Sequence, residues 1–284
     1  MGSDNVFKIL KKDKLNESMT RMVIKAPLVA AKASAGQFII LRVDEYGERI
    51  PLTISDYDRE KGTITIIYQK VGRTTMMLDK LDVGQFILDF IGPLGKASEI
   101  EGYQRVAVIG GGAGCAIAYP QAKALHSMGS YVDVIAGFRD KDLIILEDEM
   151  GKVSDTLTIM TDNGSNGNRG FVTDALLSKI NDGADYDLVI AIGPIPMMKA
   201  VSELTRRFSI KTIVSMNPIM IDGTGMCGGC RLTVAGKTKF ACVDGPDFDG
   251  HEVDFDEAMI RLGSYKRQEV RDRENHECRL MRGN

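Results

Sequence analysis

Three cysteines and one aspartate are concentrated in a glycine-rich stretch of the sequence. Asp222, Cys227, Cys230 and Cys242 are separated by four, two and eleven residues, and the stretch holds three of the five cysteines in the chain. Thiolates hold iron–sulfur clusters, and this spacing follows the C-x4-C-x2-C…C order of a [2Fe-2S] loop, with aspartate in the first position. The neighbouring glycines suit a loop that needs positive φ angles around a cluster. The pattern predicts a [2Fe-2S] cluster with these four residues as ligands.

Other interpretations of the cysteines remain open at the level of sequence. A C-x2-C pair is also typical of zinc sites, although no second pair is present and His251 stands nine residues after Cys242. Thiols without any metal are a third reading. Cys278, in the charged C-terminal stretch, is an alternative fourth ligand to Asp222. Cys115 lies in a glycine turn and is expected to be a packing residue, with a catalytic role as the alternative.

A second chemical pattern is a glycine turn between an apolar strand and a helix. Gly110, Gly111, Gly112 and Gly114 follow the run RVAVI and precede AIAYPQAKALHSMG. In this context glycines let a pyrophosphate approach the backbone at a helix N-terminus. The turn predicts a dinucleotide site, and a tight strand-to-helix connection is the alternative.

Two further strand ends are expected at the same edge of the sheet. Arg139 and Asp140 follow the strand YVDVIAGF, and Gly193 and Pro194 follow DLVIAI. Ligands of open α/β sheets bind at the carboxyl ends of strands, so Arg139 and Asp140 are candidates for ribose contacts. Asp140 opposes a 2'-phosphate, which favours NAD over NADP. The alternative is a solvated strand end without a ligand.

The elements that position these residues change character near residue 100. Before it, short β-rich runs alternate with turns, as in MTRMVIKA, GQFIILRVD and GTITIIYQK, which predicts an antiparallel barrel or sandwich. From Arg105 onward, apolar strands alternate with helices, which predicts a parallel α/β sheet. The expected division is 1–100, 101–215 and 216–284, the last part holding the cysteine loop and a charged tail.

Composition excludes several classes of function. The chain has 284 residues, 44% of them hydrophobic, and a net charge of -3, with no basic block typical of nucleic-acid binding. No apolar run approaches the roughly 20 residues of a membrane helix, and the N-terminal stretch lacks the apolar core of a signal peptide. We therefore expect a cytoplasmic protein that binds neither nucleic acid nor membrane.

A barrel, a parallel nucleotide domain and a C-terminal cluster loop, in this order, resemble the ferredoxin–NADP reductase superfamily over nearly the whole chain. The cysteine loop resembles that of dihydroorotate dehydrogenase electron-transfer subunits. It is still more similar to the alpha subunits of NADH-dependent reduced ferredoxin:NADP oxidoreductases, because Asp222 replaces the first cysteine.

The resemblance implies FAD bound between the barrel and the nucleotide domain. The flavin motif of the superfamily is R-x-Y-[ST], and the corresponding residues here are Arg49, Pro51, Leu52 and Thr53. Arg49 stands one residue too early and Leu52 replaces the tyrosine, while Thr53 matches the hydroxyl position. A second flavin element, which in the family binds the FAD pyrophosphate, corresponds to Gly72, Arg73, Thr74 and Thr75.

The implied activity is that of an oxidoreductase subunit. It exchanges hydride between NAD(H) and FAD and relays single electrons through the [2Fe-2S] cluster to a larger partner with flavin and [4Fe-4S] clusters. In that family the complex also uses ferredoxin and bifurcates electrons. Hydride transfer needs no side-chain acid or base, so no catalytic residue is predicted. The alternatives are the dihydroorotate dehydrogenase subunit and a zinc-stabilised protein that senses a nucleotide.

Overall fold

The first third of the chain forms an antiparallel, barrel-like sheet. The computed structural model describes residues 7–264. The strands are β1 (Ile9–Lys14), β2 (Met19–Lys25), β3 (Phe38–Arg42), β4 (Ile50–Asp58), β5 (Thr63–Gln69) and β6 (Asp89–Leu94), in the order β1-β2-β5-β4-β3-β6. The sheet closes because Lys8 forms a bridge with Phe86 and the Ile9 N–H donates to the Gln85 carbonyl at 2.9 Å. The helices α1 (Pro27–Ala30) and α2 (Arg73–Asp79) lie in its connections.

Period-two patterning explains this sheet. Met22 and Ile24 of β2, and Ile64 and Ile66 of β5, are fully buried at alternate positions and belong to one apolar cluster. Alternate side chains of a strand point to one face, so these residues fill the interior. The sequence prediction of an antiparallel barrel is confirmed.

The chain from residue 105 to residue 249 forms a mostly parallel sheet. Its strands are β7 (Arg105–Gly111), β8 (Tyr131–Phe138), β9 (Thr156–Thr161), β10 (Leu188–Ile192), β11 (Thr212–Ser215) and β14 (Asp247–Asp249), in the order β14-β11-β10-β7-β8-β9. All neighbouring pairs are parallel except β11 with β14. The carboxyl ends of β7 to β11 therefore meet at one edge, where ligands of such sheets bind.

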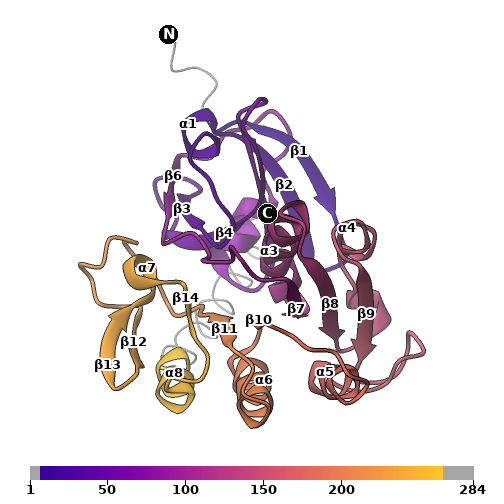
Figure 1. Cartoon of the computed structure of the whole chain (residues 1–284). Helices are drawn as coiled ribbons and strands as arrows, with labels where there is room; N and C mark the ends of the chain where they lie inside the picture. The colour runs from indigo at the N-terminus through magenta and orange to yellow at the C-terminus, as the bar shows by residue number, and fades with distance from the viewer. Residues whose placement is uncertain (1–6, 265–284) are drawn as a thin grey trace.

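Helices cover both faces of this sheet (Figure 1). They are η1 (Gly112–Gly114), α3 (Cys115–Ser127), η2 (Lys141–Leu143), α4 (Glu147–Lys152), α5 (Val172–Asn181) and α6 (Ile195–Arg207). Val106 and Val108 of β7 share a cluster with α3 and α4, whereas Ala107 and Ile109 share one with α5 and α6. Because both faces are covered, the strand is apolar and buried from Val106 to Gly111.

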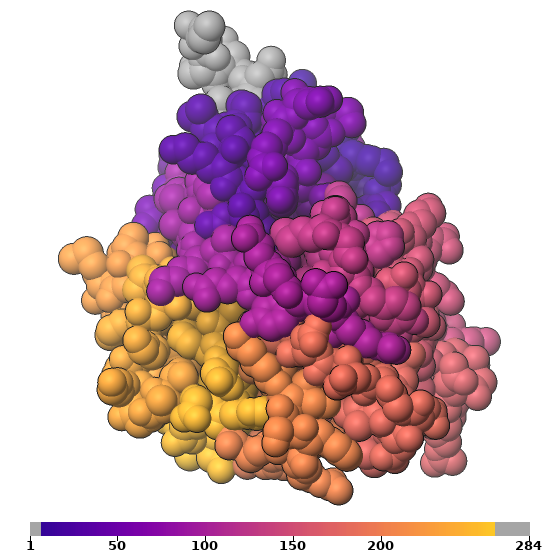
Figure 2. Space-filling model, in the orientation of Figure 1, coloured from indigo at the N-terminus to yellow at the C-terminus, as the bar shows by residue number. Residues whose placement is uncertain are grey.

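The C-terminal part folds against both sheets. It contains β12 (Arg231–Val234), β13 (Lys237–Phe240), α7 (Ala241–Asp244) and α8 (Phe255–Leu262). Cys230, Leu232 and Cys242 belong to the same apolar cluster as the second sheet and Phe38 of the barrel. Figure 2 shows this orange and yellow part beside the barrel on one surface of the molecule. The division at residues 100 and 215 stays a prediction, and β14 from the third segment completes the second sheet.

Among residues 7–264, no helix has the length and apolarity needed to cross a bilayer.

Candidate functional site

A cavity of about 700 Å³ lies at the carboxyl edge of the parallel sheet. The barrel contributes Asn16, Met19 and Gln69 to its wall, so the cavity lies between the two sheets. The predicted residues that line it are Gly111, Gly112, Gly114, Arg139, Gly193 and Pro194. The structure therefore brings together the glycine turn and both predicted strand ends.

The glycine turn packs too closely on strand β10 to hold side chains. A Cβ on Gly114 would overlap the Ile192 carbonyl oxygen and lie 2.8 Å from the Cα of Gly193. A Cβ on Gly111 would lie 2.5 Å from the Met197 sulfur. Gly112 has φ +53 and faces open space, as expected for a backbone that a ligand approaches. The turn thus fits a pyrophosphate cradle at the N-terminus of α3.

Cys115 has the packing role that the sequence predicts. Its side chain is fully buried, and a Cβ on Gly110 would lie 2.7 Å from its sulfur. Burial raises the pKa of Cys115 to about 12, so the thiol stays protonated at neutral pH. A neutral buried thiol is inert, because the thiolate is the reactive species. Gly110 therefore supports the turn from behind, away from the cavity wall.

Asp140 makes a local hydrogen bond and is not among the residues that line the cavity, so its ribose contact stays a prediction. Its Oδ1 accepts the Asp142 N–H at 3.0 Å and caps η2. The carboxylate among the cavity-lining residues is Asp162, directly after β9, and Phe171 lines the same region with 64% of its surface exposed. Neither residue is among the sequence predictions, because the strand 156–161 is not among the predicted elements. Asp162 directly follows that strand, so the rule that ligands bind at the carboxyl ends of parallel strands would have found it.

The predicted flavin residues lie on β4 and at the start of α2. Thr53 is half-buried in β4 and stands opposite Phe38 of β3 in register. Pro51 and Leu52 precede it on the strand and are also half-buried, whereas Arg49 lies before β4 and is exposed. The flavin contacts of these four residues stay a prediction.

The turn before α2 is organised by a threonine hydroxyl. Thr75 Oγ1 accepts the Gly72 N–H at 3.1 Å and donates to the Gly72 carbonyl at 2.9 Å, so Thr75 shapes the turn. Thr74 is buried, and its hydroxyl has no hydrogen-bond partner within residues 7–264, as is also true of Ser55 on β4. Unpaired buried hydroxyls favour a ligand with polar atoms here. Arg73 is exposed beside them. The residues present therefore fit FAD.

Two of the predicted metal ligands lie side by side. Cys230 and Cys242 are buried and their side chains contact each other. Burial and the neighbouring Cys230 raise the pKa of Cys242 to about 12, while a hydrogen bond from the Gly225 backbone acts in the opposite direction. Cys227 is exposed, and its sulfur accepts the Gly229 N–H at 3.5 Å. Soft thiolate donors and backbone N–H groups in one loop suit an iron–sulfur cluster.

Asp222 stabilises the same loop through its carboxylate. Its two oxygens accept the Thr224 N–H at 2.9 Å and the Cys227 N–H at 2.8 Å, and these bonds lower the pKa of Asp222. Across the described residues, no three Cys, His, Asp or Glu side chains lie close enough to hold one metal ion. Asp222 and Cys227 therefore lie on the loop but outside the Cys230–Cys242 pair. Cys278 lies outside the described residues.

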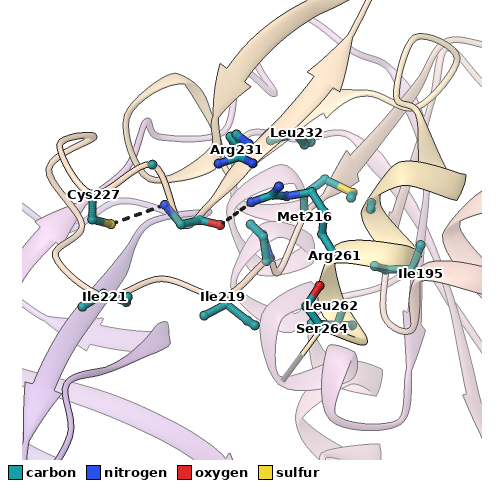
Figure 3. A pocket seen from close by; sticks show the side chains of 14 residues that line it. Ile195, Met216, Ile219, Ile221, Cys227, Arg231, Leu232, Arg261, Leu262 and Ser264 are labelled. Atoms are coloured by element: carbon teal, nitrogen blue, oxygen red, sulfur yellow. Dashed lines mark hydrogen bonds between the residues drawn. The ribbon is translucent and has the colours of Figure 1, made fainter. Parts of the chain in front are cut away.

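The cysteine loop is pressed onto the barrel. Gly223 has φ +74, and a Cβ on it would lie 2.6 Å from Ile40 of strand β3. A cavity of about 420 Å³ opens on the other side of the loop, lined by Cys227, Ile195 and Arg261 among others. Figure 3 shows Cys227 at one end of this cavity, and Arg261 donates to the Gly229 carbonyl at 3.3 Å. The loop thus lies between the barrel and an open cavity.

Comparison with known proteins decides the family. A family model described as the iron–sulfur cluster binding domain of dihydroorotate dehydrogenase B matches residues 217–254. A Thermotoga maritima protein described as a dihydroorotate dehydrogenase B (NAD(+)) electron transfer subunit homolog is 46% identical over 269 residues, which cover 95% of each chain. The chain belongs to this family of electron-transfer subunits.

Two more comparisons cover almost the whole electron-transfer subunit. An uncharacterized Clostridium beijerinckii protein encoded in an adh 3' region is 50% identical over 272 residues, which cover 93% of this chain and 92% of that protein. A chain from a solved structure of the NADH-dependent reduced ferredoxin-NADP oxidoreductase, described in terms of flavin-based electron bifurcation, is 45% identical. The match covers 97% of this chain and 99% of that chain, with a TM-score of 0.91. The predicted family and fold class are confirmed.

Proposed function

We propose that this chain is an oxidoreductase subunit that exchanges hydride between NAD(H) and FAD and passes single electrons through a [2Fe-2S] cluster to a partner subunit. The observation that carries the proposal is the position of the cysteine loop on strand β3. Gly223 of the loop packs on Ile40, and Ile40 stands opposite Pro51 of the flavin motif in the neighbouring strand. The cysteine loop therefore contacts the strand that pairs with the flavin motif, which suits electron transfer between the two sites.

The nucleotide is assigned to the cavity of about 700 Å³. The glycine turn and the N-terminus of α3 bind the pyrophosphate, with Arg139 as a cationic neighbour. Asp162 accepts hydrogen bonds from the adenosine ribose and repels a 2'-phosphate, while Phe171 offers its exposed ring to the adenine. This arrangement favours NAD over NADP, with Asp162 taking the part that the sequence analysis assigned to Asp140.

The flavin is assigned to the face of the barrel formed by β4 and α2. Thr53, Thr74 and the backbone of Gly72 are the proposed contacts, and Arg73 supplies charge. When bound, FAD accepts two electrons as hydride and releases them one at a time, which connects NADH to a one-electron cluster. The chain binds and orients the two cofactors and excludes water from between them. It needs no general acid or base, so we assign no catalytic side chain.

The cluster is assigned to Cys227, Cys230 and Cys242, with Asp222 as the fourth ligand. The thiol pair is formed already, and the loop glycines permit Cys227 and Asp222 to turn toward it. An oxygen ligand in place of a thiolate changes the ligand field of one iron and therefore the reduction potential. Among the described residues, each Asp222 oxygen accepts only one backbone N–H, so a second lone pair on it is available to the iron.

The partner is assigned to the exposed side of the cysteine loop. Met226 is 88% exposed and Ile221 57% exposed, next to the exposed Cys227. Isolated exposed apolar side chains are ordinary, but two beside a redox loop favour a protein contact. By family resemblance the partner is a larger subunit with flavin and [4Fe-4S] clusters, and the complex uses ferredoxin in a bifurcating reaction in the cytoplasm.

A second candidate is the electron-transfer subunit of dihydroorotate dehydrogenase. The match of residues 217–254 to the cluster domain of that enzyme favours it. Asp222 favours the first candidate, because the dihydroorotate relatives have four cysteines. The two candidates share their cofactors and differ in the partner, so the protein that copurifies with this chain decides between them.

The deciding experiment is anaerobic purification of the native complex, followed by absorbance spectroscopy and metal analysis. We expect flavin bands, broad iron–sulfur absorption, about two irons per chain for a [2Fe-2S] cluster, and bleaching of both chromophores by NADH. A colourless protein that contains zinc and no iron would instead establish the zinc-stabilised nucleotide sensor and end the proposal.

A further inference from the structure

A buried carboxyl group, that of Asp247, lies where the three parts of the chain meet. Its Oδ2 accepts the Ser98 hydroxyl at 2.5 Å and the Gln121 side-chain amide at 3.3 Å, and the Ser215 side chain lies beside the same carboxyl group in the neighbouring strand. Ser98 belongs to the connection between the two sheets, Gln121 to helix α3, and Ser215 to strand β11. Asp247 itself lies five residues after Cys242, the last cysteine of the loop. One side chain thus joins the barrel connection, the nucleotide sheet and the cluster segment.

One of these partners is part of the nucleotide cavity. Ser215 is the last residue of β11, and it lines the cavity together with Gly193 and Asn217. Ser215 and Asp247 stand opposite each other in the β11–β14 register. Asp247 therefore stands next to a residue of the cavity wall.

The backbone holds this junction in place from both sides. The Lys96 N–H donates to the Gly245 carbonyl at 2.7 Å, and the Met216 N–H donates to the Pro246 carbonyl at 2.9 Å. Gly36 of the barrel has φ +84, and a Cβ on it would overlap the Ser98 hydroxyl. The missing side chain at Gly36 thus leaves the space in which Ser98 reaches Asp247.

The surroundings of Asp247 favour a proton on the carboxyl. Asp247 Oδ1 and Gln121 Oε1 are buried acceptors that have no donor anywhere in residues 7–264. Burial raises the pKa of Asp247, and the groups that oppose this are neutral: Ser98, Ser215 and Gln121. Within the same residues no Lys, Arg or His forms an ion pair with it. A carboxylic acid supplies the donor that this group of acceptors lacks.

We propose that Asp247, as a neutral acid, is a positioning residue for the nucleotide site: it holds Ser215, a residue of the cavity wall, in place and connects it to Ser98 of the barrel connection. The shape of the wall near Gly193 then depends on the docking of the barrel and the cluster segment against the sheet. This inference rests on the proposed function, because it concerns the cavity assigned there to NAD(H).

The test is NAD⁺ binding to the holoprotein by titration calorimetry, which does not depend on turnover. We expect Asp247→Ala and Ser215→Ala each to weaken binding by about tenfold, on the order of one lost hydrogen bond in a buried site. Because both act through one contact, the double variant should be no weaker than either single variant. Asp247→Asn, which keeps the shape and stays neutral, should bind within twofold of wild type. Glu252→Gln, at an exposed site of the same segment, is the matched control.

The inference would be overturned if the losses of NAD⁺ affinity multiply in the double variant, or if Asp247→Ala binds NAD⁺ with wild-type affinity. If Asp247→Ala does not fold, Asp247→Asn still decides through its thermal stability at pH 5 and pH 8. The pKa of Asp247 is raised from 3.8 in the folded chain, so the folded state binds the extra proton and loses stability as pH rises above that value. Asparagine does not ionise, so Asp247→Asn avoids this loss, and the thermal stability of the variant relative to wild type should rise from pH 5 to pH 8. An advantage that does not grow contradicts a neutral acid.

The outcome is separable from that of the proposed function. A protein without flavin or iron that binds NAD⁺ through Asp247 and Ser215 would refute the redox assignment and leave the inference intact. A redox-active protein in which the variants bind NAD⁺ with wild-type affinity would support the redox assignment and refute the inference.

Discussion

Replacement of Gly114 by alanine tests whether the close contact between the glycine turn and strand β10 shapes the nucleotide site. Gly114 has φ -61, so alanine is compatible with the backbone conformation at this position. The added Cβ would overlap the Ile192 carbonyl oxygen and lie 2.8 Å from both the Ile192 carbonyl carbon and the Gly193 Cα. These atoms are backbone and have no rotamer with which to move away. The turn and the end of β10 must therefore separate.

The expected loss of NAD⁺ affinity in Gly114→Ala follows from the free-energy cost of overpacking. An extra methylene in a close-packed position costs about 1–3 kcal/mol when the surroundings must shift. If the turn relaxes by moving away from Gly193, the nucleotide must pull it back, so the same free energy opposes binding. A loss of 1–3 kcal/mol corresponds to a rise of about 5- to 150-fold in the Kd for NAD⁺. The flavin and cluster contents should not change, because neither site includes this turn.

The assay is calorimetric titration of the holoprotein with NAD⁺, supported by absorbance spectra. Gly151→Ala is the matched control, because Gly151 is exposed in α4 and the nearest atom to an added Cβ is Leu157 Cδ2 at 3.8 Å. That variant should bind NAD⁺ normally and gain about 0.5–1 kcal/mol of stability from helix propensity. Wild-type affinity in Gly114→Ala would refute the view that the turn and the end of β10 must touch to form the site.

The remaining predictions concern the cluster, the nucleotide and the partner. Cys230→Ser should lose most of the iron and its visible absorption while NADH still bleaches the flavin, as measured anaerobically; loss of both signals would show that the cluster is needed for folding. Asp162→Ser should reduce the preference for NADH over NADPH by about tenfold, which is the size of one charge contact. The measurement is the rate of flavin reduction by each nucleotide. An unchanged ratio of the two rates would show that Asp162 does not contact the nucleotide. Met226→Asp should weaken pull-down of the partner and electron delivery to it, yet leave NADH reduction of a dye intact; normal partner binding would place the interface elsewhere.

The sequence by itself determined the parts that depend on local spacing. The glycines between Gly110 and Gly114, which follow an apolar strand and precede a helix, predict a turn that a phosphate can approach, because the positive φ of Gly112 and the helix N-terminus are local features. The short separations from Asp222 to Cys230 likewise place several ligand types on one loop, whatever the rest of the chain does. Strand period and apolar runs separated the antiparallel from the parallel half.

Tertiary structure alone decided which distant residues share a site. Asp140 and Asp162 both follow parallel strands, yet Asp140 caps η2 and Asp162 lines the cavity, a choice made by the packing of the connecting segments. Ser98, Gln121 and Asp247 are far apart in sequence and meet only because β14 returns to the second sheet. Spacing constrains a backbone over a few residues, whereas contacts across a hundred residues depend on how whole sheets and helices pack, and no local pattern encodes that.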